Sequence, residues 1–401
     1  MSLAALTAME SALRTQARTL PPRRARAFDA FALSGMPHLR MEAWKWTDLR
    51  AVLRDPPPIA ADNDVIAPSI FAGVGPFEVT IMNGAAEWAD EAPTGVAICR
   101  DDGAAPLSPL AADHPLANLC AAFATDALAI DIKGAVAQPI LVRRIAGAGM
   151  VHARAIVTLG PGAEATIIET FDGAGAFFSN SVTEYRLGAG ARLTRFILQN
   201  AGDEGVETAL STLALGPRAA LDQTGLSFGG KAARIETRLA FEGDAARASL
   251  KSAIAASGAR HSDATTLVTH NATTCETRQA HKSALRDKSR GVFQGKFLVA
   301  RGAQKTDARM NAGALLLSDQ AEANHKPELE IYADDVQCSH GSTAGALDAE
   351  AIFYMRQRGL SDTAARALLV EAFLGEIFDG IAHPGIEHTY RERVARWLGA
   401  A

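Results

Sequence analysis

A turn motif recurs at a nearly constant interval in the centre of the chain. Residues 159–163 read Leu-Gly-Pro-Gly-Ala, residues 187–191 read Leu-Gly-Ala-Gly-Ala, and residues 215–219 read Leu-Gly-Pro-Arg-Ala. A looser copy, Phe-Glu-Gly-Asp-Ala, occupies residues 241–245. The first three copies are evenly spaced, and the fourth follows after a slightly shorter interval. A fixed period of about 20–30 residues is typical of a chain that stacks one structural unit on the next.

Short segments of alternating polar and apolar residues separate these turns. In residues 151–157 the odd positions are apolar, and residues 165–170 and 181–185 are similarly strand-like. Short strands, Gly-marked corners and a fixed period favour a β-solenoid, in which each coil buries a column of small aliphatic side chains. An immunoglobulin-like sandwich is the alternative, because it also has short alternating strands, but it predicts no constant period. The strand pattern continues to about residue 345.

Helical patterns precede the repeats. Leu3, Leu6, Met9 and Leu13 recur at spacings of three and four, and Pro21 interrupts the pattern. The prolines at 56–58 and the Ala-, Asp- and Asn-rich residues 60–64 read as a linker, and a short helix is expected over residues 116–123. We predict an N-terminal helical region (1–64), a mixed connecting region (65–130), a β-helix core (131–347) and a C-terminal helical region (348–401).

The C-terminal region carries two helical patterns. Ser361 and Asp362 mark a helix start, because a hydroxyl cap and an early acid both favour an N-terminus. The residues expected on one face of this helix are Leu368, Leu369, Ala372, Phe373 and Ile377. A last amphipathic helix is indicated by Ile386, Tyr390, Val394 and Trp397. This tail either caps the end of the solenoid or binds a partner, and the pattern allows both.

Composition excludes several classes of partner. Lys and Arg number 40 and Asp and Glu 45, so the net charge of −5 gives no basic surface for nucleic acid or for a membrane. No run approaches the roughly 20 apolar residues of a membrane span. The cysteines Cys99, Cys120, Cys275 and Cys338 are widely spread and form no C-x-x-C pair. With no secretory signal pattern at the start, we expect a cytoplasmic protein with reduced thiols.

No motif of a catalytic site stands out. Residues 225–232, Gly-Leu-Ser-Phe-Gly-Gly-Lys-Ala, nearly form a phosphate-binding loop, but Ala232 lacks the hydroxyl that coordinates Mg²⁺. The segment also lies among repeat strands, without the strand–loop–helix unit that such a loop requires. The chain has no G-x-S-x-G, H-E-x-x-H or EF-hand pattern. We therefore expect no nucleotide-hydrolysing site and no catalytic residues.

Cys338 and His340 form the one constellation with metal-ligand chemistry. They follow a strand-like segment, and residues i and i+2 of a strand share a face. A thiolate and an imidazole suit zinc or an iron–sulfur cluster, but they are half of a tetrahedral set. The nearest further candidates are His325 and the region of Cys275 and His281. Either another chain completes the site, or Cys338 is a buried free thiol beside a hydrogen-bonded histidine.

Several stretches of the chain resemble the SufB/SufD family of iron–sulfur cluster assembly proteins. They are residues 291–296 (Gly-Val-Phe-Gln-Gly-Lys), 304–308 (Gln-Lys-Thr-Asp-Ala), 324–341, which end in Asp-Asp-Val-Gln-Cys-Ser-His-Gly, and 353–359 (Phe-Tyr-Met-Arg-Gln-Arg-Gly). Residues 44–50 (Trp-Lys-Trp-Thr-Asp-Leu-Arg) resemble the N-terminal motif of the SufD branch, which the length and the four cysteines also favour. Ser342 and Ala344-Gly345 depart from the commoner Ala-Thr-Val-Gly, and residues 356–358 vary the usual Ser-Arg-Gly approach.

The resemblance implies a mostly β protein, with a right-handed parallel β-helix core between helical N- and C-terminal regions. It implies a non-catalytic scaffold subunit in a complex of one SufB, two SufC and one SufD, with ATP hydrolysed on SufC. A transient Fe–S cluster shared with SufB is expected, with none bound tightly by the isolated chain. Whether the isolated chain forms a homodimer is left open.

The resemblance also assigns residues to these roles. Cluster assembly is expected to involve His340, whose counterpart faces SufB, and Cys338, whose role is less defined. Pairing with SufB is expected at Asp335, Cys338 and His340. Docking of SufC is expected on the C-terminal helices, through Leu368, Leu369, Phe373 and Ile377.

An alternative function is a stand-alone β-helix enzyme that acts on polysaccharides. Such an enzyme would need a long groove with clustered acidic or basic residues, and usually an export signal. Aromatic residues make up only 6% of the chain, which leaves few platforms for stacking sugars.

Overall fold

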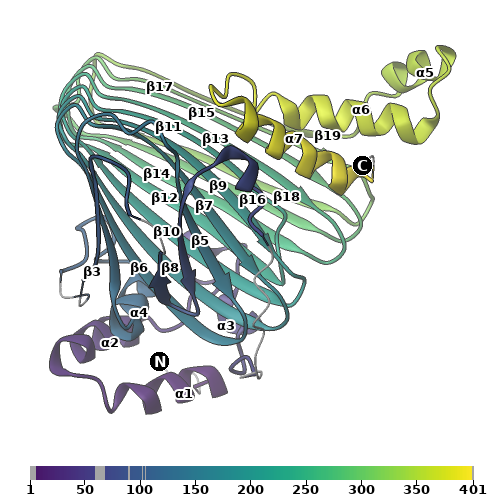
Figure 1. Ribbon diagram of the computed structural model, residues 1–401. Helices are drawn as coiled ribbons and strands as arrows, with labels where there is room; N and C mark the ends of the chain where they lie inside the picture. Colours follow the sequence, from purple (N-terminus) through teal and green to yellow (C-terminus); the bar gives the residue numbers. More distant parts are fainter. Residues whose placement is uncertain (1–5, 59–67, 89–90, 102, 104, 400–401) are drawn as a thin grey trace.

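Strands dominate the computed structural model, which describes residues 6–58, 68–88, 91–101, 103 and 105–399. A β-solenoid core of about eight turns forms the centre, with helices at both ends of the chain (Figure 1). Among the described residues, β1–β2 and β3–β4 are the antiparallel strand pairs, and the remaining pairs between strands are parallel. The solenoid prediction is therefore confirmed, and the sandwich alternative is wrong.

The strands form two sheets, between which the chain alternates as it winds. The first sheet contains β1 (Phe77–Met82), β2 (Ala85–Glu87), β5 (Ile140–Ala146), β7 (Glu164–Gly173), β9 (Arg192–Ala201), β11 (Ala220–Ser227), β13 (Arg247–Ala256), β15 (Glu276–Leu285), β17 (Asp307–Leu316) and β19 (Gln337–Gly345). The second contains β3 (Val96–Asp101), β4 (Ala127–Ile132), β6 (Gly149–Leu159), β8 (Phe177–Leu187), β10 (Gly205–Leu215), β12 (Ala232–Phe241), β14 (His261–His270), β16 (Arg290–Val299) and β18 (Glu322–Ile331).

The helices lie before, between and after these strands. They are α1 (Ala8–Ala17), α2 (Pro22–Ser34), α3 (Leu49–Val52), α4 (Pro115–Phe123), α5 (Ala349–Gln357), α6 (Asp362–Gly375) and α7 (Pro384–Leu398), with short 3₁₀ turns at Glu42–Trp44 and Ala72–Val74. The short helix expected over residues 116–123 is confirmed as α4. Leu3 and the expected linker residues 60–64 lie outside the described residues. No helix in the described part of the chain is long and apolar enough to cross a membrane.

The repeat period is set by the coils. Gly149 of β6 pairs with Phe177 of β8, which pairs with Gly205 of β10, so two successive coils here have the same length. That length equals the spacing of the first three copies of the turn motif. The later coils are longer, as the pairing of Arg290 in β16 with Glu322 in β18 shows. Longer turns therefore obscure the sequence repeat in the C-terminal half.

One corner of the solenoid explains the turn motif. In each copy a residue with positive φ precedes a buried small residue. The backbone N–H of the positive-φ residue donates a hydrogen bond to a carbonyl of the next coil: Gly162 donates to Ala189 (2.9 Å), and Gly190 donates to Pro217 (2.8 Å). The buried column consists of Ala163, Ala191, Ala219, Ala246, Cys275 and Thr306. The fourth copy therefore ends at Ala246 and not at Ala245, as the sequence pattern indicated. Ala245 has φ of 58° and is exposed, whereas Ala246 is buried.

The lumen of the solenoid is partly charged. Glu169 of β7 accepts hydrogen bonds from Arg144 (2.8 Å), from Nε of Arg195 (2.5 Å) and from the Tyr185 hydroxyl (2.7 Å), and all four side chains are buried. Burial alone would raise the pKa of Glu169, but the two guanidinium groups lower it to about 2. A buried carboxylate with several charge-assisted partners is held ionised and in one place.

The N-terminal region covers the outer face of the second sheet. The Arg234 guanidinium stacks over the ring of Trp44, with its Cζ atom 4.0 Å from the ring centroid. The Thr47 hydroxyl donates a hydrogen bond to Asp263 (2.5 Å). Arg234 itself pairs with Asp263 (2.7 Å). The Trp-Lys-Trp-Thr segment therefore anchors the N-terminal region on strands β12 and β14.

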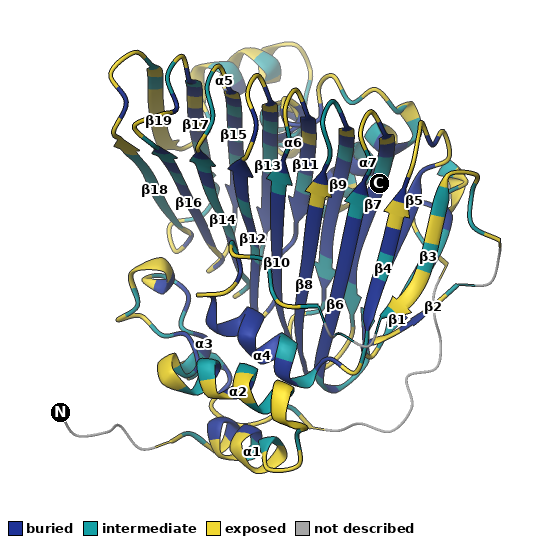
Figure 2. Cartoon of the chain, turned by 90° about the vertical axis from the view of Figure 1, so that its left-hand side faces the viewer, coloured by how far each residue is buried: buried dark blue, intermediate teal, exposed yellow. Residues whose placement is uncertain are grey.

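The C-terminal helices cover the outer face of the first sheet. Tyr390 of α7 is buried there and donates a hydrogen bond to the Ile197 carbonyl (3.0 Å). The helix start at Ser361 is confirmed, because its hydroxyl accepts from the Ala364 N–H (3.1 Å). The cap interpretation of the tail is wrong, because these helices pack on the flank of the solenoid and leave its last coil uncovered (Figures 1 and 2).

Candidate functional site

The last coil of the solenoid is the candidate site. β18 and β19 are the terminal strands of their sheets, so each has one edge that no described strand pairs with. Their residues are mostly exposed or half-buried, in contrast to the buried strands of the middle coils (Figure 2). Their inward-facing side chains are consequently presented to the surroundings instead of to another coil.

Cys338 and His340 lie on the inward face of β19. Cys338 pairs with the buried Ala308 and His340 with the buried Met310, so both continue rows of side chains that line the lumen. Two residues apart on a strand, their Cα atoms are separated by about 6.6 Å. His340 is exposed and Cys338 half-buried, which gives a thiol and an imidazole side by side at the open end.

The two groups differ in environment. Cys338 packs against Ala333 and Val336, and burial raises the pKa of its thiol, as does the negative charge of Asp307. The thiol is thus protonated near neutral pH, and binding a metal there would release its proton. Asp335 lies in the preceding turn, exposed and paired with Lys305, and its carbonyl accepts from the Lys305 N–H (2.7 Å).

The two edge strands are not equally open to pairing. β19, Gln-Cys-Ser-His-Gly-Ser-Thr-Ala-Gly, contains no Lys, Arg, Asp, Glu or Pro. β18 carries Lys326, two glutamates after it, and Pro327, which has no N–H to donate. Natural sheets protect exposed edges with charges and proline, so the uncharged edge of β19 is suited to accept a strand from another chain.

Two further imidazoles lie just inside the open end. His281 of β15 is 1% exposed and its ring stacks on Phe293, with centroids 4.6 Å apart. The centroid of the His325 ring, on β18, lies 5.7 Å from the centroid of the His281 ring, and the two ring planes form an angle of 87°. Burial lowers the pKa of His281 well below its ordinary value, helped by His325, and burial also lowers the pKa of His325. Both rings are therefore neutral near pH 7.

Cys275, the other candidate that the sequence offered, has a structural place. It is 1% exposed in the corner column between Ala246 and Thr306, and its thiol lies 3.5 Å from the Gly243 carbonyl. Within the described ranges, no group of three or more His, Cys, Asp and Glu side chains is arranged to hold a metal ion. The residues at the open end thus remain partial ligand sets.

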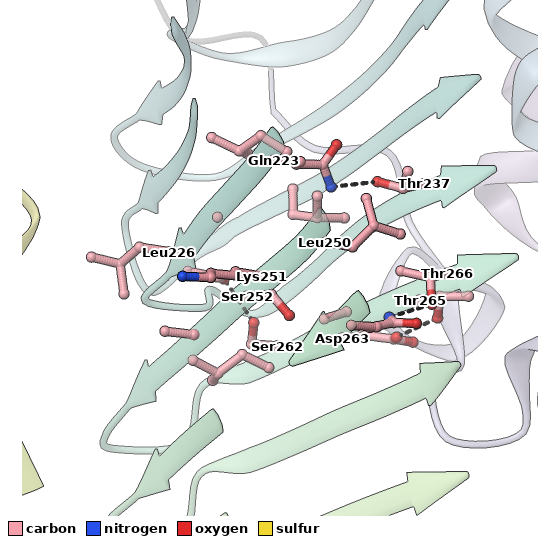
Figure 3. Close-up of a pocket in the computed structure, with 18 residues that line it drawn as sticks. Gln223, Leu226, Thr237, Leu250, Lys251, Ser252, Ser262, Asp263, Thr265 and Thr266 are labelled. Carbon is pink, nitrogen blue, oxygen red and sulfur yellow. Dashed lines mark hydrogen bonds between the residues drawn. The ribbon is translucent and has the colours of Figure 1, made fainter. Parts of the chain in front are cut away.

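The space inside the middle coils is small. A cavity of about 40 Å³ lies in the lumen between Gln223, which bonds Thr237 (3.1 Å), and Gln279, which bonds Thr266 (2.6 Å) (Figure 3). That volume holds a few waters at most. The segment 225–232 spans the end of β11 and the start of β12 with no helix after it, so it is not a nucleotide-binding loop.

The C-terminal helices place the expected docking residues in different environments. Leu368 is 45% exposed, Leu369 and Phe373 are half-buried, and Ile377 is 1% exposed against the first sheet. The expected single face is thus wrong for Leu368 and Ala372, because the buried stripe of this segment is Ala365, Val370, Leu374 and Ile377. Sequence reasoning also missed Phe353 and Tyr354 on α5, which are 64% and 60% exposed. The available signal was the adjacent aromatic pair itself, which follows Ile352, the buried residue of α5.

Residues 143–373 match the family described as "SUF system FeS cluster assembly, SufBD core domain". That range spans most of the solenoid, its open end and α5. The chain belongs to the SufBD family.

Curated SufBD relatives align with parts of the chain. It is 42% identical over 136 residues to the iron–sulfur cluster assembly protein SufD of Escherichia coli, which covers 34% of this chain and 32% of that protein. A SufBD family protein of Synechocystis is 30% identical over 256 residues, 61% of this chain and 56% of that protein. The chloroplastic protein ABCI7 of Arabidopsis thaliana is 37% identical over 119 residues, which covers 29% of this chain and 25% of that protein. The alignments thus span from a quarter to just over half of these relatives.

Membership in the SufBD family associates the chain with the SUF system of FeS cluster assembly, and one of the similar proteins is the Escherichia coli protein named SufD. Membership in this family does not favour the alternative of a polysaccharide-active enzyme.

Proposed function

We propose that the chain is the SufD-type scaffold subunit of a SufB–SufC₂–SufD complex in the cytoplasm. The observation that carries this is the open last coil, where an uncharged edge strand presents Cys338 and His340 within a region that matches the SufBD core. In this proposal SufB adds a strand along β19, and its side chains complete the half-set of ligands. The nascent Fe–S cluster is cargo shared between the two subunits.

The chemistry of the half-set suits a scaffold. A thiolate and an imidazole both ligate iron in clusters, and two ligands from one chain hold iron less firmly than a complete set. Cluster release to an acceptor then requires no large rearrangement of this chain. We assign the main role to His340, which is exposed at the open end, and a secondary one to Cys338, which is half-buried.

The proposal is tested by anaerobic co-purification with SufB and SufC. His340→Ala should leave the complex intact, and iron and acid-labile sulfide should fall several-fold. The matched control is His388→Ala, since His388 is an exposed histidine on α7, away from the last coil. Unchanged iron and sulfide in the His340→Ala complex would contradict the assigned role.

SufC, which would hydrolyse ATP in this complex, is proposed to dock on α5 and the outer side of α6. Figure 1 shows α5 projecting from the body, and its Phe353 and Tyr354, together with Leu368 of α6, are the exposed apolar side chains there. Replacing Phe353 and Tyr354 by serine should abolish SufC capture, while Glu350→Gln on the same helix should not. Deleting everything after Leu360 is a poorer test, since it would also uncover the residues that α7 buries.

A further inference from the structure

Each of the two imidazoles inside the open end has one nitrogen in use and one free. Nδ1 of His281 lies 2.8 Å from the Ser252 hydroxyl, and Nδ1 of His325 lies 3.0 Å from the Ser342 hydroxyl. The Nε2 atoms of both rings are buried and have no hydrogen-bond partner. A buried polar atom without a partner is costly and uncommon in native proteins, so two in neighbouring rings require an explanation.

Metal-ligating histidines use their two ring nitrogens in this way. Such residues usually donate the N–H of one ring nitrogen to a neighbouring oxygen, which leaves the lone pair of the other for the metal. Metal–nitrogen bonds of about 2.1 Å place each ring centroid about 3.2 Å from a shared ion, so two ligating rings have centroids about 5–6.4 Å apart. The separation between His281 and His325 is 5.7 Å, inside that range.

We propose that His281 and His325 bind one divalent transition-metal ion through their Nε2 atoms. Imidazole nitrogen suits iron(II), cobalt(II) and zinc(II), and the choice of iron(II) as the physiological ion rests on the proposed function. Water or a partner group fills the remaining positions, because the described residues offer no third ligand in place.

The ion would enter through the open end of the solenoid. His325 is half-buried and Ser342, on β19, is exposed, whereas the buried His281 lies on β15, two strands in from β19. Ser342 follows His340 by two residues on the same inward face. The dihistidine site therefore lies directly inside the proposed cluster site, where it would hold iron close to the place of assembly.

Another lumen histidine provides the comparison. His270 is fully buried and its ring lies 4.5 Å from that of Phe241, much as His281 lies against Phe293. Its Nε2 is 3.0 Å from the Thr277 hydroxyl, and its Nδ1 is buried without a hydrogen-bond partner, as the Nε2 atoms of the pair are. His270 differs in that it contacts no second imidazole among the described residues. A buried ring on an aromatic face thus does not by itself produce the paired arrangement.

The test is anaerobic titration of the purified full-length chain with Co²⁺, whose visible absorption reports nitrogen ligation. The unmodified chain should show a saturable band, and His325→Gln should weaken binding at least tenfold without changing the unfolding temperature. Ser342→Ala, which removes the partner of His325 Nδ1, should weaken binding by about tenfold. His270→Gln and His388→Gln should retain the band, because neither residue belongs to the pair or to the last coil.

Absence of a saturable band in the unmodified chain, or an identical band in His325→Gln, would overturn the proposal. His281→Gln should act as His325→Gln does, and the half-buried position of His325 keeps the test decisive if the deeper variant does not fold. The titration needs neither SufB nor SufC. Failure here therefore leaves the co-purification test of the scaffold standing, and failure of that complex to form leaves the Co²⁺ result standing.

Discussion

Glu207 should make the protein less stable as the pH rises, and Glu207→Gln should remove that dependence. The side chain lies on β10 inside the lumen, 1% exposed, and its Oε1 has no hydrogen-bond partner. Burial raises its pKa to about 8, from an ordinary value of 4.5, although the Ser179 hydrogen bond and the Arg144 charge act in the opposite direction. The folded state therefore keeps a proton that the unfolded chain releases.

The sign and size follow from proton linkage. Because the pKa is raised in the folded state, its contribution is complete below about pH 4.5 and is lost as the pH rises towards 8. Each pH unit in this window costs about 1.4 kcal/mol, so the loss reaches about 4 kcal/mol at pH 7.5 as an upper bound. Glutamine has nearly the same shape, cannot ionise, and should avoid this cost.

The assay is urea unfolding followed by circular dichroism at pH 4.5, 6.0 and 7.5. The unfolding midpoints of Glu207→Gln and the unmodified chain should nearly coincide at pH 4.5 and separate progressively at higher pH, with the variant more stable. Glu204→Gln, an exposed position at the end of the preceding turn, is the control and should leave the pH dependence unchanged. Parallel curves for Glu207→Gln and the unmodified chain at all three pH values would refute the reasoning.

Three other substitutions test the interior. Glu169→Gln leaves Arg144 and Arg195 without their buried anion and should lower the free energy of unfolding in urea by about 3–5 kcal/mol. Because the pKa of Glu169 is lowered to about 2, its contribution to stability should be complete above pH 4.5 and lost on acidification towards pH 2. An unchanged acid transition in the variant would count against this ion network. Ala219→Leu overfills the corner column and should lower the free energy of unfolding by about 1–3 kcal/mol, visible as a lower thermal midpoint. An unchanged midpoint would mean that the column has room for a larger side chain. Cys275→Ala should change stability by less than about 1.5 kcal/mol and leave the cluster content of the complex as it was, and loss of cluster would instead assign Cys275 a ligand role.

The fold was predictable because the corner has a local cause. A positive φ followed by a buried small residue favours Gly and then Ala at fixed positions. The Ala recurs at Ala163, Ala191 and Ala219, and the preceding position is Gly in the first two copies and Arg218 in the third. The pattern fades where the αL position is taken by residues such as Thr274, whose backbone makes the same bond without glycine. The repeat was therefore visible in the first half of the solenoid and weak in the second.

The charged lumen was not predictable from alternation. Helices cover the outer faces of both sheets, so strands such as β8 are buried on both sides and lose the polar–apolar pattern. Glu169 and Arg195 consequently read as surface residues in the sequence, and only the coil register brings them together. The strand period of two was enough to place Cys338 and His340 on one face, since that inference needs no tertiary information.

The meeting of His281 with His325 depends on turns of unpredictable length. The coils near the open end differ in length from the regular ones before them and from each other, as the pairings of Glu276 with Asp307 and of Arg290 with Glu322 show. Shifting either register by one residue would turn an imidazole outwards. Likewise, periodicity identified the C-terminal helices, but the face they bury depends on the flank of the first sheet, which no local pattern reveals.

The central claim, that β19 is the edge on which SufB is seated, is tested most directly by amide hydrogen exchange in the free chain and in the assembled complex. The amides of Gln337–Gly345 should become strongly protected on assembly, because their free edge gains backbone hydrogen bonds, while those of α1 and α2 should not change. Exchange along β19 that is equally fast in the free chain and in the complex, with new protection appearing elsewhere on the solenoid, would contradict the account.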